Sequence, residues 1–290
     1  METEQTLRHR IGTVRDLHAI VRTLKALAAV NVRQCDAALN ALRDYTQTVE
    51  LGLRAVLRYN AVKTPDTIRP PARLAALIFG SDVGLCGRFN EELAAFSLAQ
   101  MRDLPSQPAE RAVLAIGSRI QTRLIELGHP VADTLPTPGS ASAIGATVRL
   151  LLEKVEAWRE QGMQRVLLFY SQSGSPTLLQ LIPVDLNRFG RPNRTPWPSR
   201  TLPRHTLDDE PLLAALIRQH LFICLFRACA ESSASEHQMR LRTTQAAEKN
   251  IQETLDALEA EFRMRRQDSI DAELLEIGAG FEAVKNDRNG

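Results

Sequence analysis

Proline is missing from both ends of this sequence. All 15 prolines lie between Pro65 and Pro211, and residues 212–277 contain neither proline nor glycine. Proline breaks helix interiors and glycine weakens them, so both ends are predicted to be long helices around a turn-rich middle. We expect an N-terminal helix over 1–64, a central α/β domain over 65–211 and a C-terminal helix over 212–290.

Other scarcities exclude several classes of function. Aromatic residues make up only 5% of the chain, which suits helical arms better than a compact β-domain. The net charge of +2 is too small for a general polyanion binder, so we expect no nucleic-acid partner. The four cysteines have no metal-ligand spacing, so we expect reduced thiols in a cytosolic compartment and no metal site. These cysteines are Cys35, Cys86, Cys224 and Cys229.

No segment reads clearly as a targeting or membrane element. Residues 1–10 are polar, which predicts no signal peptide. The most apolar stretch, 212–230, contains Arg218, His220 and Arg227. It falls short of about 20 uncharged apolar residues. We expect a buried helix there, and no direct membrane insertion.

The first arm carries an apolar seam at alternating steps of four and three residues. This spacing is typical of a left-handed coiled coil. The seam consists of Leu7, Ile11, Val14, His18, Val21, Lys25, Ala28, Val32, Cys35, Leu39, Leu42, Thr46, Val49, Leu53 and Val56. A second apolar stripe lies beside it, at Leu17, Ile20, Leu24 and Leu27.

The last arm has a similar seam that changes frame near Arg266 and Gln267. It runs through Leu241, Thr244, Glu248, Ile251, Leu255, Leu258 and Phe262, and resumes from Ile270. Because a folded domain can return the chain, we expect the arms to pair antiparallel, with paired position numbers summing to about 270. The longer last arm would then overshoot by about 16 residues. Its apolar positions Leu274, Ile277, Phe281 and Val284 would need a partner protein.

Apolar runs in the middle alternate with helical stretches. We predict strands at 73–79, 112–116 and 165–170, and a possible antiparallel edge at 177–186. Helices are expected at 90–102, from Ser118 to Leu127, and at 141–159. Such alternation indicates a Rossmann-like α/β domain with a mainly parallel sheet. Residues 188–204, rich in arginine and proline, are predicted to be an exposed loop.

The glycine-rich loop Gly80–Gly87 follows the first predicted strand and is the one candidate for a phosphate site. Such loops can hold phosphate on backbone N–H groups. However, Gly87 is followed by Arg88 and Phe89, so the loop lacks the Gly-Lys-Ser/Thr ending, and it also lacks GxGxxG spacing. A structural turn is the favoured interpretation. The histidines are scattered, Asp82 and Cys86 have no partner nearby in sequence, and no catalytic constellation or cofactor site is evident.

Four segments in this order resemble the gamma subunit of F-type ATP synthases. They are the opening helix 11–33, the loop Gly-Ser-Asp-Val-Gly-Leu-Cys-Gly-Arg-Phe-Asn at 80–90, the segment 221–240 with Ala-Ser-Glu-His at 234–237, and the Arg266–Gly280 segment. The resemblance covers essentially the whole chain. Departures at Leu24, Asn31, Val83, Arg88, Phe89 and Asp271 suggest a divergent, bacterial member.

The resemblance implies a non-catalytic rotor subunit that couples ion-driven rotation to ATP synthesis or hydrolysis. Its partners would be the α and β subunits of the catalytic ring, the epsilon subunit and the membrane c-ring, on the cytoplasmic side of the bacterial inner membrane as a peripheral protein. It implies that Arg266 and Gln267 contact a β-subunit loop. It also implies that the apolar stripe at Leu274, Ile277, Phe281 and Val284 rotates in an apolar bearing of the α/β ring, and that Glu210 lies in the part of the rotor that faces the c-ring, its foot.

Three alternatives stay open at this point. Arg266 and Gln267 could belong to an ordinary solvated helix face. The whole chain could be an α/β phosphate-binding enzyme with helical extensions, which would need a ligand at Gly80–Gly87. It could also be a coiled-coil scaffold or nucleic-acid tether, which would need a basic face that residues 212–290, with a net charge of −3, do not supply.

Overall fold

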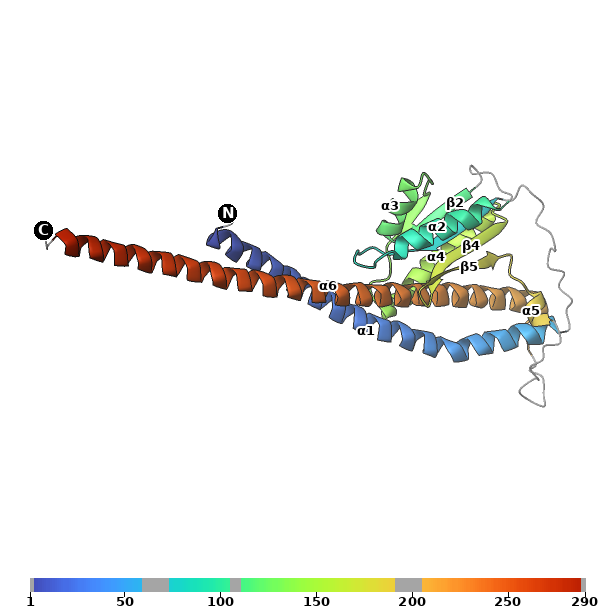
Figure 1. The fold of residues 1–290 in the computed structure, drawn as a ribbon. Helices are drawn as coiled ribbons and strands as arrows, with labels where there is room; N and C mark the ends of the chain where they lie inside the picture. Colours follow the sequence, from blue (N-terminus) through green and yellow to red (C-terminus); the bar gives the residue numbers. More distant parts are fainter. Residues whose placement is uncertain (1–2, 59–72, 105–110, 191–204, 288–290) are drawn as a thin grey trace. The chain divides into compact units, whose positions relative to one another are not determined.

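The structure is a computed structural model that describes residues 3–58, 73–104, 111–190 and 205–287 (Figure 1). The chain forms two compact units. The first consists of Met1–Leu27 and Leu241–Gly290, and the second of Ala28–Arg240. Both long helices, α1 (Glu4–Leu57) and α6 (Asp209–Asp287), contribute residues to each unit. The predicted boundary at 64/65 lies outside the described residues.

In the first unit, α1 and α6 pair antiparallel. The Arg15 guanidinium lies 2.6 Å from the Glu259 carboxylate, and the Lys25 ammonium bonds the Glu248 carboxylate. These position numbers sum to 274 and 273, close to the predicted value. Leu7, Ile11, Leu255 and Leu258 form the apolar core of this unit, with Val14 and Phe262 packed against it. The antiparallel helix pair expected from the sequence is therefore present.

The predicted seam of α1 matches the observed burial. All fifteen of its positions are buried or half-buried. Leu57 is the only fully buried position of α1 outside the seam. In α6, Thr244, Leu255 and Leu258 are buried and the other seam positions up to Phe262 are half-buried. The heptad spacing thus predicted which face of each helix is covered.

The second unit contains a five-stranded sheet with the order β3-β2-β1-β4-β5. The strands are β1 (Leu74–Phe79), β2 (Arg111–Ile116), β3 (Asp133–Leu135), β4 (Arg165–Gln172) and β5 (Ser175–Ile182). The pairs β1–β2, β1–β4 and β2–β3 are parallel, and β4–β5 is antiparallel. The sheet is therefore mainly parallel with one antiparallel edge, as the sequence predicted.

Helices cover both faces of this sheet. Side chains of β1 alternate between two cores: Ala75, Leu77 and Phe79 face one, and Leu74, Ala76 and Ile78 the other. The first core is completed by α4 (Ile144–Glu160) and the apolar part of α6, from Leu221 to Ala230. The second is completed by α2 (Phe89–Arg102) and α3 (Ser118–Glu126). Because both faces are buried, β1 reads in sequence as a continuous apolar run.

Three details differ from the predictions. The short strand β3 was not predicted. The helix predicted over 141–159 begins with a 3-10 turn, η2 (Ala141–Ala143). The loop predicted over 188–204 was wrong at its start, because α5 (Asn187–Gly190) is helical and buries Phe189; residues 191–204 lie outside the described part.

Within the described residues, α6 is the one helix long and apolar enough to cross a membrane by length and composition alone. A third of that apolar window is buried inside the protein. Leu221, Leu225 and Ala228 pack into the sheet core, and Ile223 packs against α1 residues Leu42 and Leu53. These contacts explain why much of this segment is apolar, and they agree with the helix expected to be buried there.

Candidate functional site

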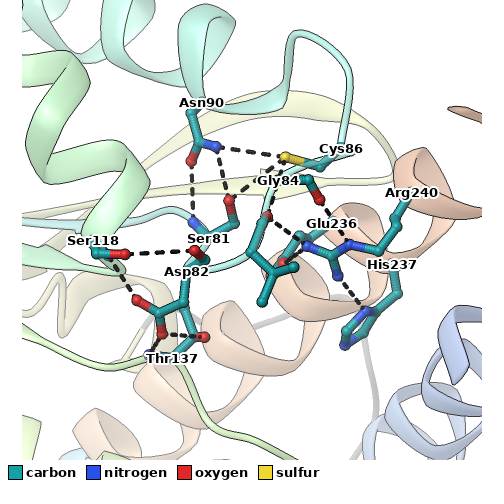
Figure 2. Close-up of polar contacts among 11 residues, drawn as sticks. Ser81, Asp82, Gly84, Cys86, Asn90, Ser118, Thr137, Glu236, His237 and Arg240 are labelled. Carbon is teal, nitrogen blue, oxygen red and sulfur yellow. Dashed lines mark hydrogen bonds and ion pairs between the residues drawn. The ribbon is translucent and has the colours of Figure 1, made fainter. Parts of the chain in front are cut away.

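The Gly80–Gly87 loop is held by contacts within the chain. Gly80 N–H donates to the Ile116 carbonyl at 2.8 Å, and Ser81 N–H donates to Asn90 Oδ1 at 3.0 Å. Asn90 Nδ2 in turn donates to Ser81 Oγ at 2.8 Å (Figure 2). A Cβ on Gly80 would lie 2.2 Å from Ile120 Cβ, so only glycine fits there. These contacts support the structural turn over a phosphate site.

Asp82 ties this loop to two other segments. Its carboxylate accepts hydrogen bonds from Ser118 N–H and from both the N–H and the hydroxyl of Thr137, each at 2.7 Å (Figure 2). Burial acts to raise the pKa of Asp82, but these hydrogen bonds outweigh it and hold the pKa below 3.8. The carboxylate also lies at the N-terminus of α3, where negative charge is favoured. Asp82 therefore has hydrogen-bond partners 36 and 55 residues further along the chain, which a search among its sequence neighbours could not find.

Arg240 of α6 clamps the other side of the loop. Its guanidinium donates to the carbonyls of Val83 (2.8 Å) and Gly84 (3.1 Å) and to the Glu236 carboxylate (2.6 Å). Arg240 and Glu236 are each only 5% exposed. Figure 2 shows the guanidinium between the loop and the helix turn that carries Glu236 and His237. We call Arg240, Glu236 and their loop carbonyls the α6 clamp.

The protonation states within the clamp follow from its donors. Arginine has no acceptor, so His237 Nδ1, which lies 3.0 Å from Arg240 Nη1, must accept and carry no proton. Burial, together with the Arg240 charge, lowers the pKa of His237 to about 4. Burial raises the pKa of Glu236 to about 6, against the attraction of Arg240. At neutral pH the clamp is thus an ion pair beside a neutral imidazole.

Two serines fasten the same helix to the ends of β1 and β4. Ser232 Oγ donates to the Phe79 carbonyl at 3.1 Å, and Ser235 Oγ donates to the Ser171 carbonyl at 3.1 Å. Gly174 N–H donates to Ser235 Oγ at 3.2 Å. The Ser-Glu-His segment and Arg240 therefore share one role, which is to hold α6 against the strand ends and the loop.

The predicted contact residues of α6 lie past its pairing with α1. Arg266 and Gln267 are exposed. Leu274 is 61% exposed and Ile277 62%, while Leu275, which the sequence analysis did not single out, is 75% exposed. In the first unit, α6 continues beyond the start of α1 (Figure 1). The predicted overshoot is thus present, with its described apolar side chains uncovered by this chain.

The other predicted contact positions lie on the two long helices. The helix α6 runs through Phe281 and Val284, whose side chains lie outside the described part. Glu210 is exposed in the first turn of α6. In the second apolar stripe of α1, Leu17, Ile20 and Leu27 are about half exposed, at 48%, 57% and 55%. Among the described residues, no group of three or more His, Cys, Asp or Glu side chains could hold a metal ion.

The class of protein is defined by two long helices that pair antiparallel, with a mainly parallel α/β domain between them in sequence. The end of the longer helix is exposed. The ATP synthase family matches residues 3–284 of the chain. The chain belongs to the ATP synthase family.

Curated relatives agree with this assignment, and solved structures share the fold. The ATP synthase gamma chain of Anaeromyxobacter sp. (strain K) is 27% identical, with 98% of this chain and 100% of the relative aligned. That of Gloeobacter violaceus is 26% identical, over 96% and 98%. The rotor of the Euglena gracilis mitochondrial ATP synthase has a similar fold, with a TM-score of 0.60, 14% identity, and 92% and 98% coverage. The fold is also similar in the central stalk of the Tetrahymena thermophila enzyme, with a TM-score of 0.54, 18% identity, and 79% and 99% coverage.

Proposed function

We propose that this protein is the central-stalk rotor subunit of a bacterial F-type ATP synthase, with no catalytic residues of its own. The observation that carries the proposal is the family match over residues 3–284. The subunit is inferred from the relatives, which are gamma chains. In the loop Gly80–Gly87, Gly80 has no room for a side chain and the N–H groups of Gly80 and Ser81 donate within the chain, so these contacts offer no support for the phosphate-binding alternative.

In this role the chain works through contact and stiffness. The rotor turns inside a ring of α and β subunits and presents different faces to three catalytic sites in turn. Rotation then favours different nucleotide states by differential contact. The absence of proline from α1, and from α6 after Pro211, keeps the backbone hydrogen bonds of both helices continuous.

The test of this proposal is assembly. The full chain is expressed with the α and β subunits from the same genome, and the complex is purified on a tag carried by β. We expect one copy of this chain to co-purify with the ring, and a bead attached to it to rotate when ATP is added. A ring that forms without this chain, or a bound chain that does not rotate, would contradict the proposal.

Arg266 and Gln267 are proposed to hydrogen-bond a loop of a β subunit. Both are exposed, and an arginine fork can hold a carboxylate through two hydrogen bonds. We expect Arg266→Ala with Gln267→Ala to leave assembly intact and to lower ATP-driven ion pumping relative to ATP hydrolysis. Arg242→Ala with Gln245→Ala is a matched control on the same helix, also exposed. Equal pumping by the two double variants would favour the solvated-face alternative.

The apolar end of α6 is proposed to turn in a bearing of the ring, formed around Leu274, Ile277, Phe281 and Val284. Leu274 and Ile277 are largely exposed, so replacing both by serine should leave the unfolding of the isolated chain unchanged. The same change should loosen the complex, seen as faster loss of the rotor from the ring on dilution. An unchanged dissociation rate would argue against the bearing.

The opposite end is proposed as the foot. There Glu210 would face the c-ring, and the epsilon subunit would bind nearby, which places the complex peripherally on the cytoplasmic side of the inner membrane. We expect Glu210→Lys to reduce proton or sodium pumping by membrane vesicles while leaving ATP hydrolysis by the detached ring unchanged. Equal pumping by Glu210→Lys and wild type would show that Glu210 takes no part in the contact with the c-ring.

A further inference from the structure

A small cavity lies in the second unit, where α1, α6 and the segment that leads into α4 meet. The space that it leaves for the centre of a water-sized molecule is about 10 Å³. It is lined by Asn31, Cys35, Pro138, Ser140, Ala141, Ile144, Ser233 and His237. Since all of these residues lie between Ala28 and Arg240, the cavity belongs to one unit and to none of the contacts proposed above.

The size of the cavity restricts what can bind there. A cavity needs about 10–15 Å³ of such space to hold one water molecule. Pockets for organic ligands are far larger, and a chloride ion is larger than a water molecule. Two buried side chains, Cys35 and Ile144, form part of the wall. A single water molecule is therefore the ligand that fits the cavity.

His237 brings a hydrogen-bond donor to this cavity. Its Nδ1 accepts from Arg240 and burial lowers its pKa to about 4, so the ring is neutral at pH 7 and carries its proton on Nε2. Nε2 lies on the edge of the ring that points away from the guanidinium (Figure 2). In the described part of the chain, the contact with Arg240 is the only side-chain hydrogen bond of His237. A water molecule in the cavity would supply the acceptor that Nε2–H lacks among these residues.

Two more polar side chains of the cavity wall have no hydrogen-bond partner among the described residues. They are Asn31 of α1 and Ser233 of α6, which are both half-buried. The Ser140 hydroxyl is bonded to that of Ser142 at 2.8 Å and can form another hydrogen bond. A buried water molecule typically makes about three hydrogen bonds, and amide and hydroxyl groups can either donate or accept. The wall thus provides enough partners for one water molecule.

We propose that this cavity binds one structural water molecule, which accepts a hydrogen bond from His237 Nε2 and bonds the side chains of Asn31 and Ser233. The water connects α1 to α6 beside the α6 clamp. Its bond to Nε2–H stabilises the tautomer of His237 whose Nδ1 accepts from Arg240. The inference concerns the folded chain alone and does not depend on the proposed function.

The first test is a crystal structure of the full chain, from crystals grown in bromide in place of chloride. We expect density for one water molecule within about 3.2 Å of His237 Nε2 and of a second polar atom of the wall. A bromide ion at this place, recognised by its anomalous scattering, would overturn the proposal. An absence of density in the cavity, at a resolution that shows other buried water molecules, would overturn it as well.

A matched pair of asparagines tests the same water molecule in solution. Asn31→Leu removes a polar partner of the water, whereas Asn40→Leu makes the same change at an exposed position of α1. Leucine favours the helix over asparagine at both positions. We expect Asn31→Leu to lower the urea midpoint of the full chain relative to Asn40→Leu, because the water loses a hydrogen bond beside a new apolar side chain. A midpoint equal to or above that of Asn40→Leu would indicate a dry cavity and overturn the proposal.

A combined variant tests whether Asn31 and Ser233 share one water molecule. Either Asn31→Leu or Ser233→Ala alone should weaken the binding of the water, so the second change has less left to remove. The double variant should therefore lower the urea midpoint by clearly less than the sum of the two single changes. The helix propensity of each new residue contributes equally to single and double variants, so it cancels in this comparison. Additive shifts would overturn the shared water molecule.

Discussion

The α6 clamp predicts a large, pH-dependent loss of stability in Arg240→Met. Methionine keeps the length and apolar stem of the side chain but removes all of its donors. The Glu236 carboxylate, 5% exposed, would then be charged without its partner, and the carbonyls of Val83 and Gly84 would lose their shared donor. Removing one member of a buried ion pair costs about 3–5 kcal/mol.

The assay is urea unfolding of the full chain at pH 8 and pH 5. We expect Arg240→Met to lower the free energy of unfolding by about 3–5 kcal/mol at pH 8. The loss of Arg240 should raise the pKa of Glu236 further above about 6. Glu236 therefore takes up a proton in the folded variant at pH 5, and the destabilisation should be smaller there.

Two further variants separate charge from packing. Glu236→Gln combined with Arg240→Met leaves no buried charge and should recover part of the lost stability. Arg242→Met changes an exposed arginine two residues away and should shift stability by less than about 0.5 kcal/mol. A loss below about 1 kcal/mol for Arg240→Met, or an equal loss at both pH values, would refute the clamp as an energetic feature.

Three other predictions follow from the geometry. Gly80→Ala should destabilise the fold by about 1–3 kcal/mol because its methyl would meet Ile120, while Gly139→Ala, with no atom within 4 Å of the new Cβ, should be nearly neutral in the same urea titration. Burial, helped by nearby arginines, lowers the pKa of His220 to about 4. The contribution of neutral His220 to the free energy of unfolding is therefore complete above pH 6.5 and is lost as the pH falls towards 4. His220→Leu should flatten the decline of stability between pH 6.5 and 4.5, and an unchanged slope would count against this. Leu24→Cys with Thr244→Cys should form a disulfide on mild oxidation, whereas pairs shifted by one helix turn should not; equal yields across registers would refute the antiparallel alignment.

The helical seams could be predicted because their cause is local. A residue at every third or fourth position must face the same neighbour, so the spacing alone indicates which side chains are buried. All fifteen predicted positions of α1 are indeed covered at least in part. The exposed end of α6 followed from the same logic, since Leu274 and Ile277 continue an apolar pattern past the length of the shorter helix.

The contacts around the glycine-rich loop could not be predicted in the same way. Asp82 bonds Ser118 and Thr137, and Arg240 bonds carbonyls more than 150 residues earlier. No periodic pattern relates such positions, because strand order and helix placement bring them together. Strand β3 was missed for a related reason: three residues, Asp-Thr-Leu, give no run to recognise, and their pairing with β2 depends on the sheet already present.

Helix α6 changes its side-chain chemistry along its length, and its neighbours within the chain change with it. Up to Arg240 its buried face includes serines, Glu236 and Arg240, which match the polar ends of strands and the loop. From Leu241 to Phe262 it carries a seam that matches α1. Beyond Phe262 the apolar positions recur, yet the described ones are uncovered in this chain. Apolar side chains stabilise only when removed from water, by about 25 cal/mol per Å², so this third pattern would contribute stability only in contact with a further partner, which the proposed ring would supply.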